Sequence, residues 1–187
     1  YITVLMAMMN MVSHGTQDMY PTFLQRDWEL GPRSRAALTA FSQVGALVGG
    51  VLCGLYSDRF GRRRTIAFAL LGAFLTIPIW AFAPALPLLW LGAFVMQFFV
   101  QGAWGVIPAH INELSPDGVR GFLPGFAYQC GVAVASQIPH VQALFAAHAS
   151  YAQTMALSAA LVFVGGAVIA VVGPERRGVA FGSPRPH

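Results

Sequence analysis

Three long stretches without a charged side chain constrain this sequence more than any other feature. They lie between Arg35 and Asp58, between Arg64 and Glu113, and between Arg120 and Glu175. A helix needs about 20 apolar residues to cross the hydrocarbon core of a bilayer, so these stretches provide for one, two and two membrane-spanning helices. Charged residues make up 10% of the sequence, whereas soluble domains average roughly 25%. We therefore expect an all-α, polytopic integral membrane protein.

Six spans are expected once the breaks inside the long stretches are placed. Prolines interrupt the apolar pattern at residues 84–87, and small polar residues interrupt it at 146–150. With a further span at the start of the chain, the six lie near residues 1–25, 35–57, 65–83, 88–111, 122–145 and 152–173. Residues 174–187 are rich in Gly, Pro and Arg and are expected to form a disordered cytoplasmic tail.

The arginines are distributed unequally between the two sides that six spans define. One side carries Arg59, Arg62, Arg63, Arg64, Arg120, Arg176, Arg177 and Arg185. The other carries Arg26, Arg33 and Arg35. By the positive-inside rule the first side is cytoplasmic, and we expect a multi-pass protein of the plasma (inner) membrane. A soluble bundle would need polar faces on its outer helices, and these stretches lack them.

The loop after the second expected span has a specific pattern, Gly-Leu-Tyr-Ser-Asp-Arg-Phe-Gly-Arg-Arg-Arg at residues 54–64. The orientation rule accounts for its arginines but not for its two glycines or its aspartate. Asp58 follows the end of a helix, where a cation is favoured, so its charge is expected to serve a neighbouring arginine or helix N-terminus. The pattern resembles the G-x-x-x-D-R-x-G-R-R loop of the major facilitator superfamily. Its fixed positions are Gly54, Asp58, Arg59, Gly61, Arg62 and Arg63.

A second loop, after the fourth expected span, supports the same resemblance. Residues from Glu113 to Arg120 and the glycine that follows fit the E-x-x-P-x-x-x-R-G pattern of sugar-porter-like members. The resemblance implies one six-helix half of a twelve-helix transporter, with these two loops helping to gate it. It also implies a missing amino-terminal half as partner and a substrate site near the midplane, between the halves.

The first expected span carries a polar face. Asn10, His14, Asp18 and Thr22 recur at every fourth residue, with Ser13 and Gln17 beside them. An ionisable side chain at such depth costs at least about 2.5 kcal/mol, so we expect this face to line a water-filled transport path. His14 and Asp18 lie one turn apart and are expected to share a proton, because imidazole changes charge near neutral pH. Hydrogen bonding between helices is the alternative role for these side chains.

The same segment resembles the signature N-x-x-S/T-H-x-S/T-Q-D, followed by Thr, of monocarboxylate-proton symporters. The matching positions are Asn10, Ser13, His14, Thr16, Gln17, Asp18 and Thr22. The resemblance implies symport of a short monocarboxylate such as lactate or pyruvate, with the proton as coupling ion and no cofactor. It also implies a substrate contact from Gln129 in the fifth span. Val132 departs from that family, in which an Asn is expected.

Several alternatives remain open at this point. The chain could serve a major facilitator transporter of a sialic acid, a sugar or an exported drug, or it could be a six-span subunit that carries nothing. Gln97, Gln101 and Gly105 share one ridge of the fourth span and could face a cavity or another helix. Gly45, Gly49, Gly50 and Gly54 are spaced for helix packing.

Other function classes find no support in the sequence. Neither a catalytic triad nor metal-ligand spacing nor a phosphate-binding loop occurs, so neither an enzyme nor a metal site is expected. The positive charge lies in short segments that fit membrane-flanking loops, which argues against nucleic-acid binding. No arginine lies centrally in a span. The cation that holds a substrate carboxylate is therefore expected from the missing half.

Overall fold

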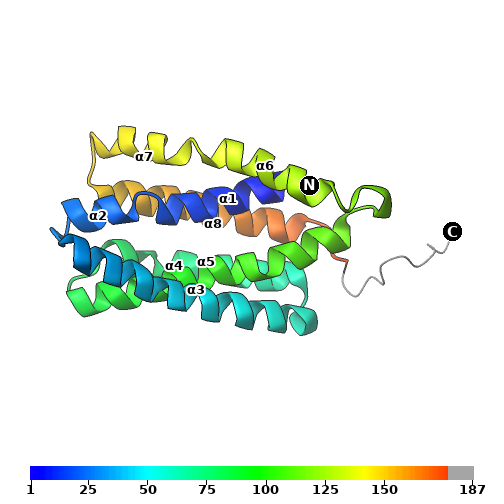
Figure 1. Ribbon diagram of the computed structural model, residues 1–187, viewed down its shortest axis with the longest axis horizontal. Helices are drawn as coiled ribbons and strands as arrows, with labels where there is room; N and C mark the ends of the chain where they lie inside the picture. Colours follow the sequence, from blue (N-terminus) through cyan, green and yellow to red (C-terminus); the bar gives the residue numbers. More distant parts are fainter. Residues whose placement is uncertain (177–187) are drawn as a thin grey trace.

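The computed structural model describes residues 1–176, and every regular element in that range is helical. The elements are α1 (Ile2–Gln17), α2 (Tyr20–Arg26), α3 (Pro32–Phe60), α4 (Arg62–Ala81), α5 (Leu86–Leu114), the short 3-10 helix η1 (Asp117–Val119), α6 (Leu123–Ala135), α7 (Ile138–Ala146) and α8 (Tyr151–Val172). The helices run along the long axis of the molecule, and the chain turns at its two ends (Figure 1). The all-α expectation is confirmed.

Four of the described helices, α3, α4, α5 and α8, are long and apolar enough to cross a membrane. Their outer faces carry large apolar side chains that no part of the described protein covers. Leu47 on α3, Leu75 on α4 and Leu161 on α8 are 69%, 68% and 65% exposed. Such a surface suits contact with lipid chains and would aggregate in water, which argues against a soluble bundle.

Proline divides the first and the fifth expected spans. The segment near 1–25 consists of α1 and α2, and the segment near 122–145 consists of α6 and α7, rather than one helix each. A proline in a helix clashes with the carbonyl four residues earlier and lacks the N–H that would bond to it. Pro21 stands four residues after Gln17, the last residue of α1, and Pro139 stands four residues after Ala135, the last residue of α6. Six membrane crossings remain a prediction.

The helices form two groups that meet through α4 and α8. α5 packs between α3 and α4, and α1 packs against α6 and α8. Figure 1 shows α6 and α7 along one edge, α1, α2 and α8 in the middle, and α3, α4 and α5 along the other edge. Glycines allow α3 to approach α5 closely. A Cβ added to Gly49 would collide with the Phe98 carbonyl, and one added to Gly105 with that of Gly50. The packing role predicted for the glycines of α3 is confirmed at Gly49, and also at Gly45, where a Cβ would collide with the Phe94 carbonyl.

The loops alternate between the two ends of the bundle as the arginine distribution requires. The turn after α3, the end of α5 and the end of α8 share one end, where Arg62 contacts Glu113 and Glu175. The loop before α3 and the start of α8 share the other, where the Asp27 carboxylate accepts a hydrogen bond from the Ala152 N–H. Of the expected tail, residues 174–176 are described. The remainder, with Arg177 and Arg185, lies outside the described residues.

Candidate functional site

A polar cavity of about 360 Å³ opens beside the carboxyl end of α1. Side chains of α1, α5 and α6 and the residue that follows α1 line it: Asn10, Ser13, His14, Gln17, Asp18, Gln101, Trp104 and Tyr128. Five of the eight belong to the polar face that the sequence predicts. The cavity thus gathers amide, hydroxyl, imidazole, carboxylate and indole groups at one place.

His14 and Asp18 form the one ionisable pair of this lining. The His14 Nδ1 and an Asp18 carboxylate oxygen lie 2.7 Å apart. The two side chains are 32% and 36% exposed, and both line the cavity. A proton held between them makes the pair neutral overall, and its loss leaves a net negative charge. The geometry therefore provides a site where a proton can bind at the cavity wall.

α5 and α6 add hydrogen-bonding and aromatic groups in and beside the lining. The Gln17 side-chain amide donates to the Gln97 carbonyl oxygen of α5 at 3.2 Å. The rings of Trp104 and Tyr128 meet edge to face, with centroids 6.2 Å apart. The Trp104 indole N–H is buried and has no partner among residues 1–176. A buried donor without a partner is uncommon in proteins, so this N–H is a candidate contact for a bound molecule.

Three predicted site residues lie outside the cavity lining. Thr16 is buried and donates its hydroxyl proton to the Val12 carbonyl at 2.9 Å. Thr22 lies beyond the break, on α2, and Gln129 is exposed on α6. Tyr128, the neighbour of Gln129, takes part in the lining instead. Val132 is half-buried on α6 and does not reach the cavity either.

The residues on one ridge of α5 have different roles. The sequence left open whether this ridge faces a cavity or another helix. Gln101 lines the cavity. Gln97 is buried and binds Gln17, which joins α5 to α1. Gly105 faces α3 at Gly50. Cavity lining and helix packing therefore both occur on this ridge.

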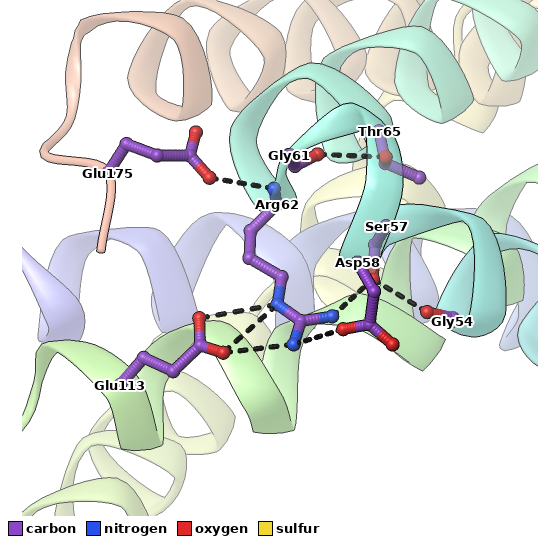
Figure 2. Close-up of polar contacts among 8 residues, drawn as sticks. All are labelled: Gly54, Ser57, Asp58, Gly61, Arg62, Thr65, Glu113 and Glu175. Atoms are coloured by element: carbon purple, nitrogen blue, oxygen red, sulfur yellow. Dashed lines mark hydrogen bonds and ion pairs between the residues drawn. The ribbon is translucent and has the colours of Figure 1, made fainter. Parts of the chain in front are cut away.

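The two loops that carry the sequence patterns meet at Arg62, as Figure 2 shows. The Arg62 guanidinium lies 2.9 Å from a Glu113 carboxylate oxygen and 2.6 Å from an Asp58 carboxylate oxygen. It also donates to the Ser57 hydroxyl at 2.5 Å. Arg62 and Glu113 are 9% and 7% exposed. The predicted pairing of Asp58 with a neighbouring arginine is thus present, and it ties the end of α3 to the start of α4.

Gly61 makes the tight turn between these helices possible. Its φ is +98°, a conformation that side-chain-bearing residues rarely adopt. The Gly61 carbonyl accepts a hydrogen bond from the Thr65 hydroxyl at 2.9 Å. The turn therefore requires the glycine at this position of the loop pattern.

Glu175 completes the network, although the sequence reading assigned it to the tail. Its carboxylate accepts a hydrogen bond from the backbone N–H of Arg62 at 2.8 Å (Figure 2). It also accepts one from the backbone N–H of Arg63 at 3.3 Å. An anion here offsets the positive end of the helix macrodipole of α4. Three successive arginines in the first turn of α4 are the signal that could have indicated a nearby acid.

The remaining loop residues connect the helix ends locally. Arg120 donates to the carbonyls of Asn112 and Ser115, both at 3.1 Å, and pairs with Asp117 at 2.6 Å. Arg63 donates from Nε to the Ala170 carbonyl at 3.0 Å, which joins α4 to α8. Arg59 and Gly54 lie on the last turns of α3, where the Gly54 carbonyl accepts a hydrogen bond from the Ser57 hydroxyl.

Charge and metal chemistry in the described region are limited. No arginine is among the residues that line the cavity beside His14. Within residues 1–176 no three His, Cys, Asp or Glu side chains gather closely enough to hold a metal ion. Within residues 1–176, oppositely charged or ionisable side chains pair in the polar cavity, in the Arg62 network and between Arg120 and Asp117.

Comparison with known proteins gives consistent matches. The family model described as "Sugar (and other) transporter" matches residues 4–174. The chain is 31% identical over 132 residues to a carboxylic acid transporter protein homolog of Saccharomyces cerevisiae, a match covering 70% of this chain and 21% of that protein. It is 32% identical over 136 residues to a facilitated glucose transporter of Gallus gallus, covering 67% and 27%.

A solved structure shows the same fold. The crystal structure of a D-xylose-proton symporter superposes with a TM-score of 0.73 at 20% identity, covering 94% of this chain and 48% of that one. The present chain thus spans about half the length of that symporter.

Proposed function

This chain belongs to the sugar (and other) transporter family of the major facilitator superfamily. We propose that it forms the carboxyl-terminal half of a proton-coupled symporter for a small organic anion. It is a multi-pass membrane protein of a family of transporters, not of enzymes. The observation that carries the proposal is the His14–Asp18 pair, 2.7 Å apart in the wall of the polar cavity.

The pair supplies a simple basis for coupling. Without its extra proton it is negative and repels an anion that enters the cavity, and with the proton it is neutral. Charges a few Å apart interact far more strongly at low effective dielectric than in water. The proton and the anion therefore favour one another's binding, which is the requirement for symport.

A short monocarboxylate such as lactate or pyruvate is the proposed substrate. Support comes from the match of the first span to the signature of monocarboxylate-proton symporters. Further support comes from the yeast relative, whose name specifies carboxylic acid transport. The unpartnered Trp104 N–H and the Gln101 amide are the proposed donors to substrate oxygens. An arginine from the amino-terminal half is proposed to neutralise the carboxylate, because a carboxylate in an apolar surrounding is costly without a cation.

A sugar is the second candidate substrate. The family and the Gallus gallus glucose transporter favour it, as does the supply of neutral hydrogen-bonding groups from Asn10, Gln17 and Gln101. A neutral sugar needs no counter-charge. The two candidates are therefore separated by whether unlabelled monocarboxylates or sugars compete with uptake.

The test is uptake of radiolabelled lactate by intact cells that express the complete protein at their plasma membrane, with and without a protonophore. Asp18→Asn should lower accumulation to the level that equilibration without a proton gradient reaches, because the pair can no longer carry the coupling proton. Exchange of labelled for unlabelled lactate should persist, since it needs no net proton movement. Glu29→Gln, at an exposed loop position, is the matched control and should accumulate lactate normally.

Either of two results would contradict the proposal. Full accumulation by Asp18→Asn would show that the His14–Asp18 pair does not couple proton movement to substrate movement. Uptake of a labelled sugar by the parent, without competition from lactate, would replace the carboxylate by the second candidate.

A further inference from the structure

Two adjoining hollows lie at the arginine-rich end of the bundle, away from the polar cavity. One is a polar pocket of about 330 Å³ whose lining includes Gly61, Arg63 and Glu175. The other is a groove of about 520 Å³ between α3, α4 and α5. Phe60 and Arg64 line both. The two hollows therefore adjoin at these two side chains, with the polar hollow on one side and the apolar groove on the other.

The groove is apolar and open toward the outside of the bundle. Its lining includes Leu52, Tyr56, Phe60, Phe68 and Phe98. Phe60 and Phe68 are 62% and 66% exposed. On a membrane-spanning bundle, exposed apolar side chains such as these face the acyl chains of the lipids. The volume falls within the roughly 300–1,000 Å³ of ordinary ligand sites.

Arg64 marks the polar boundary of the groove. It is exposed in the first turn of α4 and makes no hydrogen bond or ion pair with another described residue. Its neighbours Arg62 and Arg63 are both engaged, with Glu113 and with the Ala170 carbonyl. Arg63 and Arg64 give the polar pocket two positive charges against the one negative charge of Glu175. The pocket therefore carries a net charge of about +1 and favours an anion.

We propose that this site binds one anionic phospholipid of the cytoplasmic leaflet, with its phosphate against Arg64 in the polar pocket and an acyl chain in the groove. A guanidinium binds phosphate through a planar fork of donors. Anionic lipids concentrate in the leaflet on which the positive-inside rule places this end of the bundle. A polar hollow and an apolar groove that adjoin at Arg64 and Phe60 match a molecule with a charged head and an apolar tail.

A tryptophan reporter in the groove tests the proposal on the complete protein in lipid nanodiscs. Phe68→Trp places the reporter in the groove, and Leu75→Trp places it at an exposed position of α4 outside the groove. Quenching is measured with brominated phosphatidylglycerol diluted into phosphatidylcholine, and with brominated phosphatidylcholine diluted in the same way. The signal of the parent's own tryptophans is subtracted. Each measurement is repeated with Arg64→Gln.

We expect Phe68→Trp to report a preference for phosphatidylglycerol of about 5-fold, the ratio that one arginine at a membrane surface contributes. Arg64→Gln should bring the ratio close to 1, and Leu75→Trp should show no preference. Equal quenching by both lipids at Phe68→Trp would overturn the proposal, and so would a preference that survives Arg64→Gln. Absence of quenching at Phe68→Trp while Leu75→Trp is quenched would show that protein, such as the other half of the transporter, fills the groove.

Discussion

At the scale of single residues, Arg62 concentrates the contacts of the loop pattern. One guanidinium serves two carboxylates, from α3 and α5, and a serine hydroxyl, while its backbone N–H serves a third carboxylate beyond α8. Arginine is suited to this role because its donors are fixed in a plane and can serve several acceptors together. A lysine would present a point charge with a shorter reach.

Removing the Arg62 side chain should destabilise the protein because Glu113 would be left buried without its cation. Breaking a buried pair from one side costs about 3–5 kcal/mol. We expect Arg62→Gln to lower the midpoint of thermal unfolding in detergent clearly, and Arg62→Lys to lower it less. Arg26→Gln changes an exposed arginine of α2 and should leave the midpoint nearly unchanged. An equal, small effect of Arg62→Gln and Arg26→Gln would contradict the assigned role.

Glu175 should act locally, on the start of α4. Loss of a side chain that caps a helix costs about 1 kcal/mol, and the carboxylate also offsets the macrodipole. We expect Glu175→Ala to speed hydrogen exchange of the amides at residues 62–65, and Glu175→Gln, which retains an acceptor oxygen, to speed it less. Amides in the first turns of α5 are the internal reference. Unchanged exchange at 62–65 in both variants would exclude the capping role.

At the scale of helices, the sequence predicted the features that neighbouring residues determine and missed those that depend on packing between distant segments. The length of the apolar stretches and the positions of the charged loops are local properties of the sequence. They predicted the all-α class correctly, and they placed each charged loop at the correct end of the bundle. The two broken helices have a local cause at Pro21 and Pro139, but Pro78 and Pro108 stand inside the unbroken α4 and α5. The proline rule alone could therefore not have placed the breaks.

The rotation of α6 could not be predicted in the same way, because it depends on packing. A Cβ added to Gly131 would lie 2.7 Å from the Asn10 amide nitrogen, so α6 approaches α1 closely there. Residues three apart share a face of a helix, which turns Tyr128 toward the cavity and Gln129 away from it. Glu175 was missed for a similar reason, since its contact with Arg62 bridges 113 positions of the chain.

The close approach of α3 to α5 predicts that a larger residue at the contact destabilises the protein. A methyl group at Gly49 would collide with the Phe98 backbone carbonyl, whereas Gly125 on α6 has open space. Overpacking typically costs about 1–3 kcal/mol, and Ala in place of helical Gly gains roughly 0.5–1 kcal/mol. We expect Gly49→Ala to lower the midpoint of thermal unfolding and Gly125→Ala to raise it slightly. A higher midpoint for Gly49→Ala would show that the two helices are not in tight contact.

At the scale of the whole molecule, the fold matches 48% of the chain of a solved symporter. In the proposed transporter, each half would line only part of the substrate path. The cavity beside His14 opens at the surface of the described chain, which agrees with a site that a second half completes. The arginine-rich end bears the Arg62 network and the proposed lipid site. The orientation of this end therefore decides which face of the membrane both of them serve.

Single cysteines on the two ends test that orientation in intact cells that express the complete protein. Gly118→Cys lies in η1, at the arginine-rich end, and Glu29→Cys lies in the loop before α3, at the other end. Both positions are exposed. Because Lys and Arg are retained on the cytoplasmic side, an impermeant maleimide should label Glu29→Cys in intact cells and Gly118→Cys only after permeabilisation. The parent, with Cys53 and Cys130 on apolar helices, measures the background. The reverse labelling pattern would show that the arginine-rich end faces the outside of the cell. Labelling of both positions in intact cells would contradict the placement of the two loops on opposite sides of the membrane.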